Sequence, residues 1–127
     1  RPNMRDTMQH PRPSISRWFA ASGCLLAGLA VALSAYAAHG VEGDARARLT
    51  LAAAFAFGHG VALAALAGHT VRIVKTLALA ALLVGVVLFS GSLVGEALRG
   101  WSTAAAPVGG MLLIGGWLVL AAHSLRR

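Results

Sequence analysis

The chain has 127 residues, of which 57% are hydrophobic and only 12% are charged, and its mean hydropathy is +0.72. In soluble domains about a quarter of the residues are charged. The low charged fraction of this chain therefore excludes an ordinary soluble protein and indicates that lipid surrounds most of the chain. The net charge of +7 would favour nucleic-acid binding in a soluble protein, but here the basic residues stand at the ends of apolar stretches, where they meet lipid head groups. We therefore expect one domain inside a membrane and no nucleic-acid partner.

The first 17 residues form a polar segment with three prolines and four arginines. Such a segment has no apolar face to bury. Residues 1–17 are therefore predicted to be a basic tail that lies on the membrane surface or against a partner.

The first apolar run covers residues 18–38 and allows two interpretations. Residues 34–38 resemble a small-residue signal-peptidase site after an apolar core, which would make the run a cleaved signal. The run is long for the apolar region of a signal peptide, so we predict a retained transmembrane helix. The stretch 39–48 contains two glycines and mixed charges, which predict a loop.

Three further apolar runs follow, and a short basic end closes the chain. About 20 residues cross a hydrocarbon layer of ~30 Å as a helix, and helices satisfy every backbone amide internally. Proline at position 107 suits a first helical turn, where an amide donor would be unpaired anyway. The predicted fold is an all-α membrane protein, a bundle of four transmembrane helices at 18–38, 49–69, 76–98 and 107–123, with a basic end at 124–127.

The basic residues are distributed unequally between the two sides of the predicted bundle. One side holds Arg1, Arg5, Arg12, Arg17, Arg72, Lys75, Arg126 and Arg127. The other side holds Arg46, Arg48 and Arg99, together with Glu42, Asp44 and Glu96. Because cytoplasmic loops carry the excess of lysine and arginine, both termini are predicted to be cytoplasmic.

Small residues recur at helical spacing along each apolar run, and such residues allow close packing of helices in lipid. We expect the four small-residue faces to converge on one tight interior, which argues against a wide aqueous pore. A substrate cleft that needs close backbone approach is the alternative. The candidate packing positions are Gly23, Ser34, Gly60, Gly85, Gly109 and Gly116.

His59 is the most informative polar residue, because it lies near the middle of the second run. An ionisable group there must turn inward and find a partner. It is either a functional group or a neutral imidazole bonded to a serine hydroxyl or to a carbonyl of a neighbouring helix. His39 ends the first run, and its imidazole is expected either to cap the last carbonyls of the helix or to act as a ligand.

A second set of polar residues lies in the third run. Ser92 and Glu96 share one helix face, so with Ser90 they could form a polar relay towards His39. The alternative is a serine bonded back to its own helix and a glutamate at the water interface, paired with Arg99.

Catalytic and metal-binding motifs are missing from the sequence. It has no H-E-x-x-H, no G-x-S-x-G and no phosphate-cradling glycine loop, and its single cysteine, Cys24, has no second cysteine to pair with. His69 and the other histidines are not spaced along the sequence as the ligands of a metal site would be. We predict no enzymatic activity, no cofactor and no metal, and we interpret Trp18, Trp101 and Trp117 as interfacial anchors and packing residues.

The chain resembles the family of small bacterial membrane proteins known as domain of unknown function 423, to which the animal transmembrane protein 256 is related. The resemblance spans about residues 20 to 122. This chain has Phe55 where a tyrosine is common and Gly60 where an alanine follows the histidine, which weakens any argument for a tyrosine–histidine pair. The matching pieces are 35–40 (AYAAHG), His59, 88–93 (LFSGSL), 107–110 (PVGG) and 116–118 (GWL).

The resemblance implies four helices and a location in the bacterial inner membrane, and it implies no activity. Our leading hypothesis is a non-enzymatic accessory or structural subunit of a membrane complex. Its expected partners are membrane lipids and either another protein or a second copy, contacted through small-residue helix faces. The alternative is a small transporter, channel or lipid-handling protein with a polar track of His39, His59, Ser90, Ser92 and Glu96.

Overall fold

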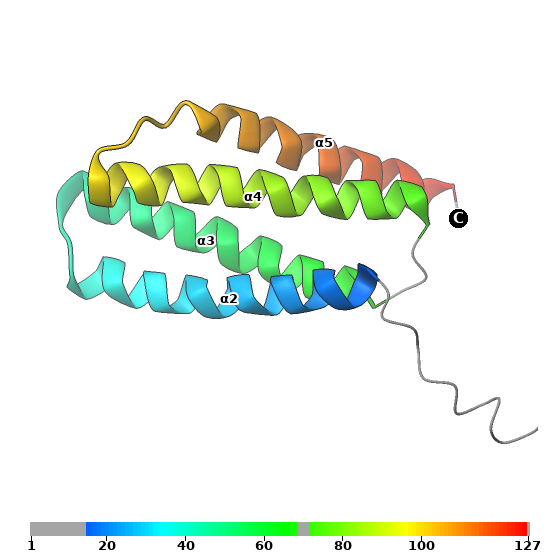
Figure 1. The fold of residues 1–127 in the computed structure, drawn as a ribbon, viewed down its shortest axis with the longest axis horizontal. Helices are drawn as coiled ribbons and strands as arrows, with labels where there is room; N and C mark the ends of the chain where they lie inside the picture. Colours follow the sequence, from blue (N-terminus) through cyan, green and yellow to red (C-terminus); the bar gives the residue numbers. More distant parts are fainter. Residues whose placement is uncertain (1–14, 69–71, 127) are drawn as a thin grey trace, which may run out of the picture.

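The protein folds into four long helices, as seen in a computed structural model that describes residues 15–68 and 72–126 (Figure 1). Most of the predicted tail, and His69, lie outside these residues. All four helices are long and apolar enough to cross a membrane. The prediction of an all-helical membrane protein with four spans is thus confirmed. The helices are α2 (Ile15–His39), α3 (Gly43–Leu66), α4 (Ile73–Arg99) and α5 (Ala105–Leu125).

Helix α3 begins at Gly43, well before the predicted start at residue 49. The sequence from Asp44 onward has neither glycine nor proline for several residues, so nothing there opposes a helix. Gly43 itself has φ +64°, a conformation that glycine adopts without steric cost. The predicted loop 39–48 is therefore reduced to residues 40–42, and two arginines expected in that loop lie on a helix.

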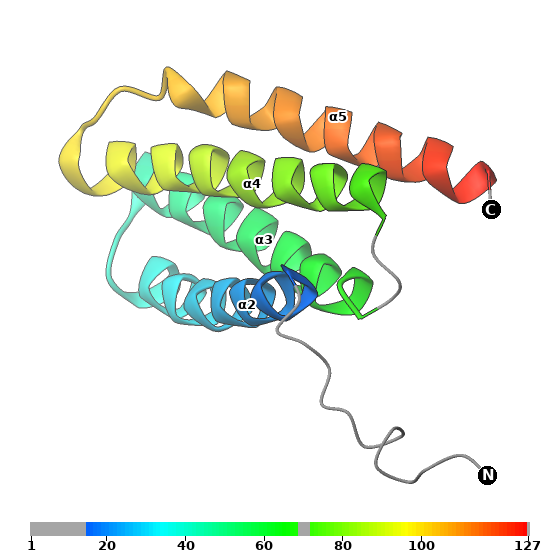
Figure 2. The same cartoon turned by 45° about the vertical axis from the view of Figure 1, so that its right-hand side comes forward.

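The helices are arranged in a row in chain order rather than around a common centre (Figures 1 and 2). α2 packs along α3 and α4 packs along α5, while α3 and α4 join the two pairs. Within the described residues, no Cα atom of α5 comes within 8 Å of α2 or α3. The expectation of four small-residue faces converging on one interior was therefore wrong, because the glycine contacts are made within each pair and the pairs meet only through α3 and α4 and a small contact of α2 with α4.

Each pair is held by a crossing of two glycines. A Cβ atom built on Gly60 of α3 would lie 2.6 Å from the carbonyl oxygen of Gly23 on α2. One built on Gly109 of α5 would lie 2.7 Å from the carbonyl oxygen of Gly85 on α4. These distances leave no room for a side chain, so the helix backbones touch directly at both crossings. Gly116 is also buried, against Leu82.

Ser34, the remaining predicted packing position, is exposed. The buried face of α2 instead passes through Gly23, Ala30 and Ala37, which are spaced by seven residues. A seven-residue repeat is typical of helices that wind around each other with a left-handed twist. Ser34 lies four residues after Ala30 and three residues before Ala37, so it stands beside this buried face and not on it.

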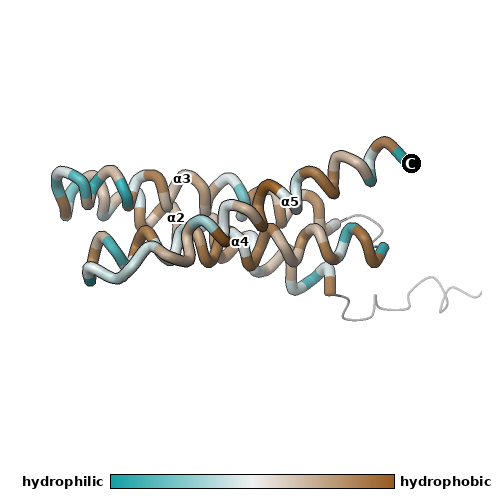
Figure 3. The backbone as a smooth tube through the Cα atoms, turned by 90° about the horizontal axis from the view of Figure 1, so that it is seen from above, coloured by the Kyte–Doolittle hydropathy of each residue, from teal (hydrophilic) through white to brown (hydrophobic). Residues whose placement is uncertain are grey.

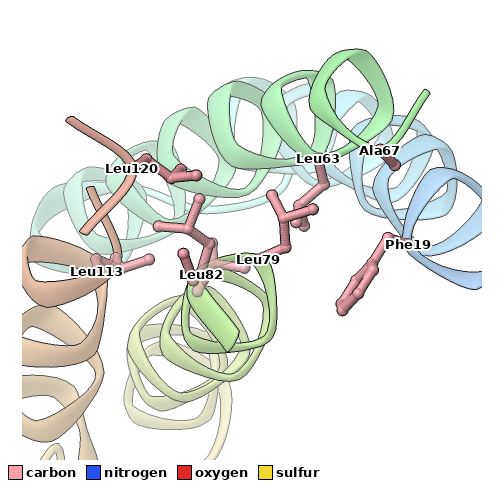
Figure 4. Packing of buried hydrophobic residues seen from close by; sticks show 9 residues of the cluster. Phe19, Leu63, Ala67, Leu79, Leu82, Leu113 and Leu120 are labelled. Atoms are coloured by element: carbon pink, nitrogen blue, oxygen red, sulfur yellow. The ribbon is translucent and has the colours of Figure 1, made fainter. Parts of the chain in front are cut away.

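The largest apolar core lies between α3 and α4, with contributions from the other two helices (Figure 4). Leu63, Leu79 and Leu82 are completely buried there. Phe19 reaches the cluster from α2, and Leu113 reaches it from α5. The core therefore fixes the two helix pairs to each other.

Hydrophilic residues gather mostly towards the two ends of the helices (Figure 3). We call the end with the α2–α3 and α4–α5 connections the hairpin end. The opposite end, where α2 begins and α5 ends, is the terminal end (Figure 1). In the described part of the chain, the terminal end carries basic residues and no acidic ones, namely Arg17, Arg72, Lys75 and Arg126.

Candidate functional site

His59 is hydrogen-bonded on both ring nitrogens. Its Nδ1 lies 2.8 Å from the carbonyl oxygen of Phe55, one turn earlier on α3. Its Nε2 lies 3.0 Å from Nε1 of Trp117 on α5. This side-chain pair joins two helices whose backbones do not touch.

These contacts assign a hydrogen-bond role to each ring nitrogen of the imidazole. The indole N–H of Trp117 is a donor only, so Nε2 of His59 accepts and carries no proton. Nδ1 must then hold the proton and donate it to the Phe55 carbonyl. Both ring nitrogens of His59 are therefore satisfied in this arrangement.

An aromatic row accompanies this pair across three helices. The rings of Phe55 and His59 stack with centroids 5.7 Å apart. Phe55 also contacts Phe89 of α4 at 4.5 Å, and the His59 and Trp117 rings lie 5.8 Å apart. The row, made of Phe55, His59, Phe89 and Trp117, links α3, α4 and α5.

Ser90 forms a second contact between helices. Its buried hydroxyl donates to the carbonyl oxygen of Ala52 on α3 at 2.9 Å. The alternative of a serine bonded back to its own helix therefore does not describe Ser90. Ser92 is half-buried and shares no hydrogen bond with Glu96, so the structure does not form the relay on this face.

Glu96 forms an ion pair with a residue that the sequence analysis had placed in a loop. Its Oε1 lies 3.8 Å from a guanidinium nitrogen of Arg48 on α3. The expected pairing with Arg99 was wrong, because the early start of α3 brings Arg48 beside the last turns of α4. The pair is loose and partly exposed, with 40% of the Arg48 side chain and 28% of the Glu96 side chain accessible.

Arg46 takes the capping role that was one of the two alternatives for His39. Its guanidinium donates to the carbonyl oxygens of Ala37 at 3.1 Å and Ala38 at 3.2 Å, both in the last turn of α2. It also donates to Val41 in the connection. His39 itself is exposed and forms none of these bonds.

Of the five residues of the predicted polar track, His59, Ser90 and Glu96 enter separate contacts, whereas His39 is exposed and Ser92 is half-buried. Among the described residues, no group of three or more histidine, cysteine, aspartate or glutamate side chains is placed to hold a metal. His59, Ser90 and Glu96 each join α3 to another helix. These three contacts link α3 to α4 and to α5.

A comparison with protein-family models identifies the wider group to which this chain is related. The model described as protein of unknown function (DUF423) matches residues 33–110, more than half of the chain. The chain belongs to the DUF423 family. No curated protein and no solved structure matches it. The family resemblance inferred from the sequence motifs is confirmed.

The DUF423 match runs from the second half of α2 to the first turns of α5. It includes His59, Ser90 and the Arg48–Glu96 pair, but it ends before Trp117. Sequence reasoning missed Arg46 and Arg48 as contact residues. The signal was present in the helix-permitting stretch after Gly43, which makes both arginines part of α3.

We expect the His59–Trp117 bond to stabilise this DUF423 protein by about 0.5–1.5 kcal/mol, the range of hydrogen bonds between membrane helices. Trp117→Phe, His59→Leu and the double variant form a double-mutant cycle that isolates this coupling energy. The free energy of unfolding is measured in mild detergent by titration with a denaturing detergent.

Trp18→Phe is the matched control. Trp18 is 71% exposed and lies on α2, which carries neither member of the pair. It is expected to change stability by less than about 0.5 kcal/mol. If Trp117→Phe costs as much with leucine at position 59 as with histidine, the two side chains are not coupled and the bond does not join the helices.

Proposed function

We propose that this DUF423 protein is a non-enzymatic accessory subunit of a membrane complex, and that the outward face of α2 binds a transmembrane helix of another protein. The observation behind this proposal is a second small-residue face on α2. α2 lies at one edge of the row and packs mainly on α3. Its open side carries Ala21, Cys24, Gly28, Ala32 and Ala35, all of them exposed.

The buried face of the same helix shows how this chain makes helix contacts. Gly23 and Ala30 pack closely on α3 because their small size lets the backbones approach. Gly28 has the same property on the open side, and nothing lies within 4 Å of the place where its Cβ would stand. A second helix can therefore approach this face as closely as α3 approaches the first.

The polar contacts support a role without catalysis. His59 is occupied on both nitrogens, and no histidine of the described segments is hydrogen-bonded to a carboxylate. The carboxylate of Glu96 lies beside Arg48 instead. These groups act in helix packing, so they do not supply a general base next to a nucleophile.

The proposal includes the bacterial inner membrane as the location, with both termini in the cytoplasm. The support is the charge of the two ends. The described basic residues of the terminal end have no acidic neighbour, whereas Glu42, Asp44 and Glu96 offset the arginines of the hairpin end.

The test is a comparison of native complexes. The protein is purified in mild detergent at its natural expression level, and its stoichiometric partners are identified by mass spectrometry. We expect one larger membrane protein to co-purify with the wild type, and we expect Gly28→Leu to reduce its recovery about tenfold or more, because the added side chain separates the helices. A bifunctional maleimide should link the Cys24 thiol to a cysteine thiol on the facing helix of that partner.

Gly115→Leu is the matched control, because Gly115 is exposed on α5 and also has open space around it. This variant should keep the partner. Recovery of only this chain, with Cys24 linked to Cys24 of a second copy, would replace the accessory-subunit proposal by self-association. Equal partner loss in both variants would remove α2 as the binding face.

A further inference from the structure

A groove opens at the hairpin end, where α5 stands apart from α3. It has a volume of about 510 Å³. Arg48 contributes from α3, Glu96, Leu93 and Phe89 contribute from α4, and Gly110 contributes from the first turns of α5. The groove is open to the side because no backbone contact closes α5 onto α3 within the described residues.

The polarity of the groove changes with depth. Arg48 lies in the second turn of α3 and Glu96 in the last turn of α4, so both charges stand near the membrane–water boundary. Leu93 and Phe89 follow on the same helix towards the middle of the span. Phe89 is about 10 Å deeper than Glu96 at 1.5 Å of rise per residue. We call the outer part of the groove, with Arg48 and Glu96, its mouth. A charged mouth followed by apolar residues deeper in the membrane matches the order of head group and acyl chain in a phospholipid.

The two charged side chains at the mouth keep hydrogen-bonding capacity that contacts within the described residues do not fill. Arg48 has five N–H donors, and its contact with Glu96 is long at 3.8 Å. At this length the contact is an ion pair and not a hydrogen bond, and the Arg48 guanidinium forms no hydrogen bond within residues 15–68 and 72–126. Glu96 likewise retains lone pairs that can accept further bonds. The mouth therefore presents one positive and one negative group side by side, with no net charge.

We propose that this groove binds one zwitterionic phospholipid with a primary ammonium head group. Arg48 binds the phosphate, and Glu96 accepts hydrogen bonds from the ammonium. One acyl chain lies over Leu93 and Phe89 towards the aromatic row. A choline head group fits less well, because a quaternary ammonium has no N–H to donate. Phosphatidylglycerol, an anionic lipid without an amine, would place no cation beside Glu96. This site is separate from the α2 face, so it does not depend on the partner proposed above.

The test measures lipid binding to the whole purified protein by native mass spectrometry. Phosphatidylethanolamine, phosphatidylcholine and phosphatidylglycerol of matched chain length are titrated into delipidated protein. We expect one phosphatidylethanolamine to bind about tenfold more tightly than the other two. Glu96→Gln should remove the preference over phosphatidylcholine, and Arg48→Gln should weaken both zwitterionic lipids about tenfold.

Two further variants control for charge and for folding. Arg99→Gln removes a neighbouring charge outside the groove and should leave all three affinities unchanged. Gly110→Leu fills the groove without touching either charge and should abolish the single tight site while the unfolding midpoint stays within a few degrees. Equal binding of the three lipids, preference for phosphatidylglycerol, or unchanged preference in Glu96→Gln would each overturn the proposal, whatever partner α2 binds.

Discussion

Replacing Gly60 with leucine is expected to separate α2 from α3 and to lower the free energy of unfolding by about 3 kcal/mol or more. A Cβ at this position would lie 2.6 Å from the carbonyl oxygen of Gly23 and 2.9 Å from the amide nitrogen of Ala27. Both atoms belong to the backbone of α2, so no side-chain rotation can relieve the clash. The helices must move apart and lose their close packing.

Gly58→Leu is the matched control for this prediction. Gly58 is two residues earlier on α3, is exposed, and has nothing within 4 Å of its Cβ direction. The same chemical change there should leave stability unchanged or slightly raised, since leucine favours a helix over glycine by up to about 1 kcal/mol. Denaturing-detergent titration followed by circular dichroism measures both variants. Equal midpoints for the two would show that the α2–α3 crossing does not hold the fold.

Gly109→Leu is expected to open the second pair, α4 and α5, at a comparable cost of about 3 kcal/mol or more. A Cβ on Gly109 would lie 2.6 Å from the amide nitrogen of Phe89 and 2.7 Å from the carbonyl oxygen of Gly85. Displacement of α5 should also break the hydrogen bond between Trp117 and His59. We therefore expect a change in tryptophan fluorescence together with the lower unfolding midpoint.

Gly115→Leu tests whether leucine on α5 is harmful in itself. Gly115 is exposed, with open space around it, and should tolerate the change. If Gly109→Leu and Gly115→Leu unfold at the wild-type midpoint, α5 does not depend on the glycine crossing. If both are equally destabilised, the effect belongs to the outer surface of α5 and not to its contact with α4.

Membrane insertion and the number of helices follow from the sequence for a simple reason. Four apolar runs of sufficient length leave the backbone no alternative in lipid, so helix type and number are local properties. The sequence does not define where each helix starts in the same way. Charged residues at a membrane boundary are compatible with either a loop or a helix. Arg46 and Arg48 are the clearest example, since their position on α3 depends on the turn at Gly43.

The partners of the polar side chains could not be predicted from the spacing of residues along a single helix. The sequence indicates that His59 needs an inward partner, but the indole of Trp117 is 58 residues away. Ser90 and Ala52 are separated by 38 residues. Such pairs depend on the order of the helices in space and on their rotation, which no local pattern contains.

The sequence by itself determined that this is a membrane protein with four helical spans, because hydrophobicity and length act locally along the chain. It also indicated five of the six packing positions, since only small residues allow close approach in lipid. The tertiary structure decided that the helices form a row of two pairs, that Ser34 faces outward, and that the charges of Arg48 and Glu96 meet. These features depend on how the helices twist and cross, and that geometry arises from packing between residues far apart in the chain.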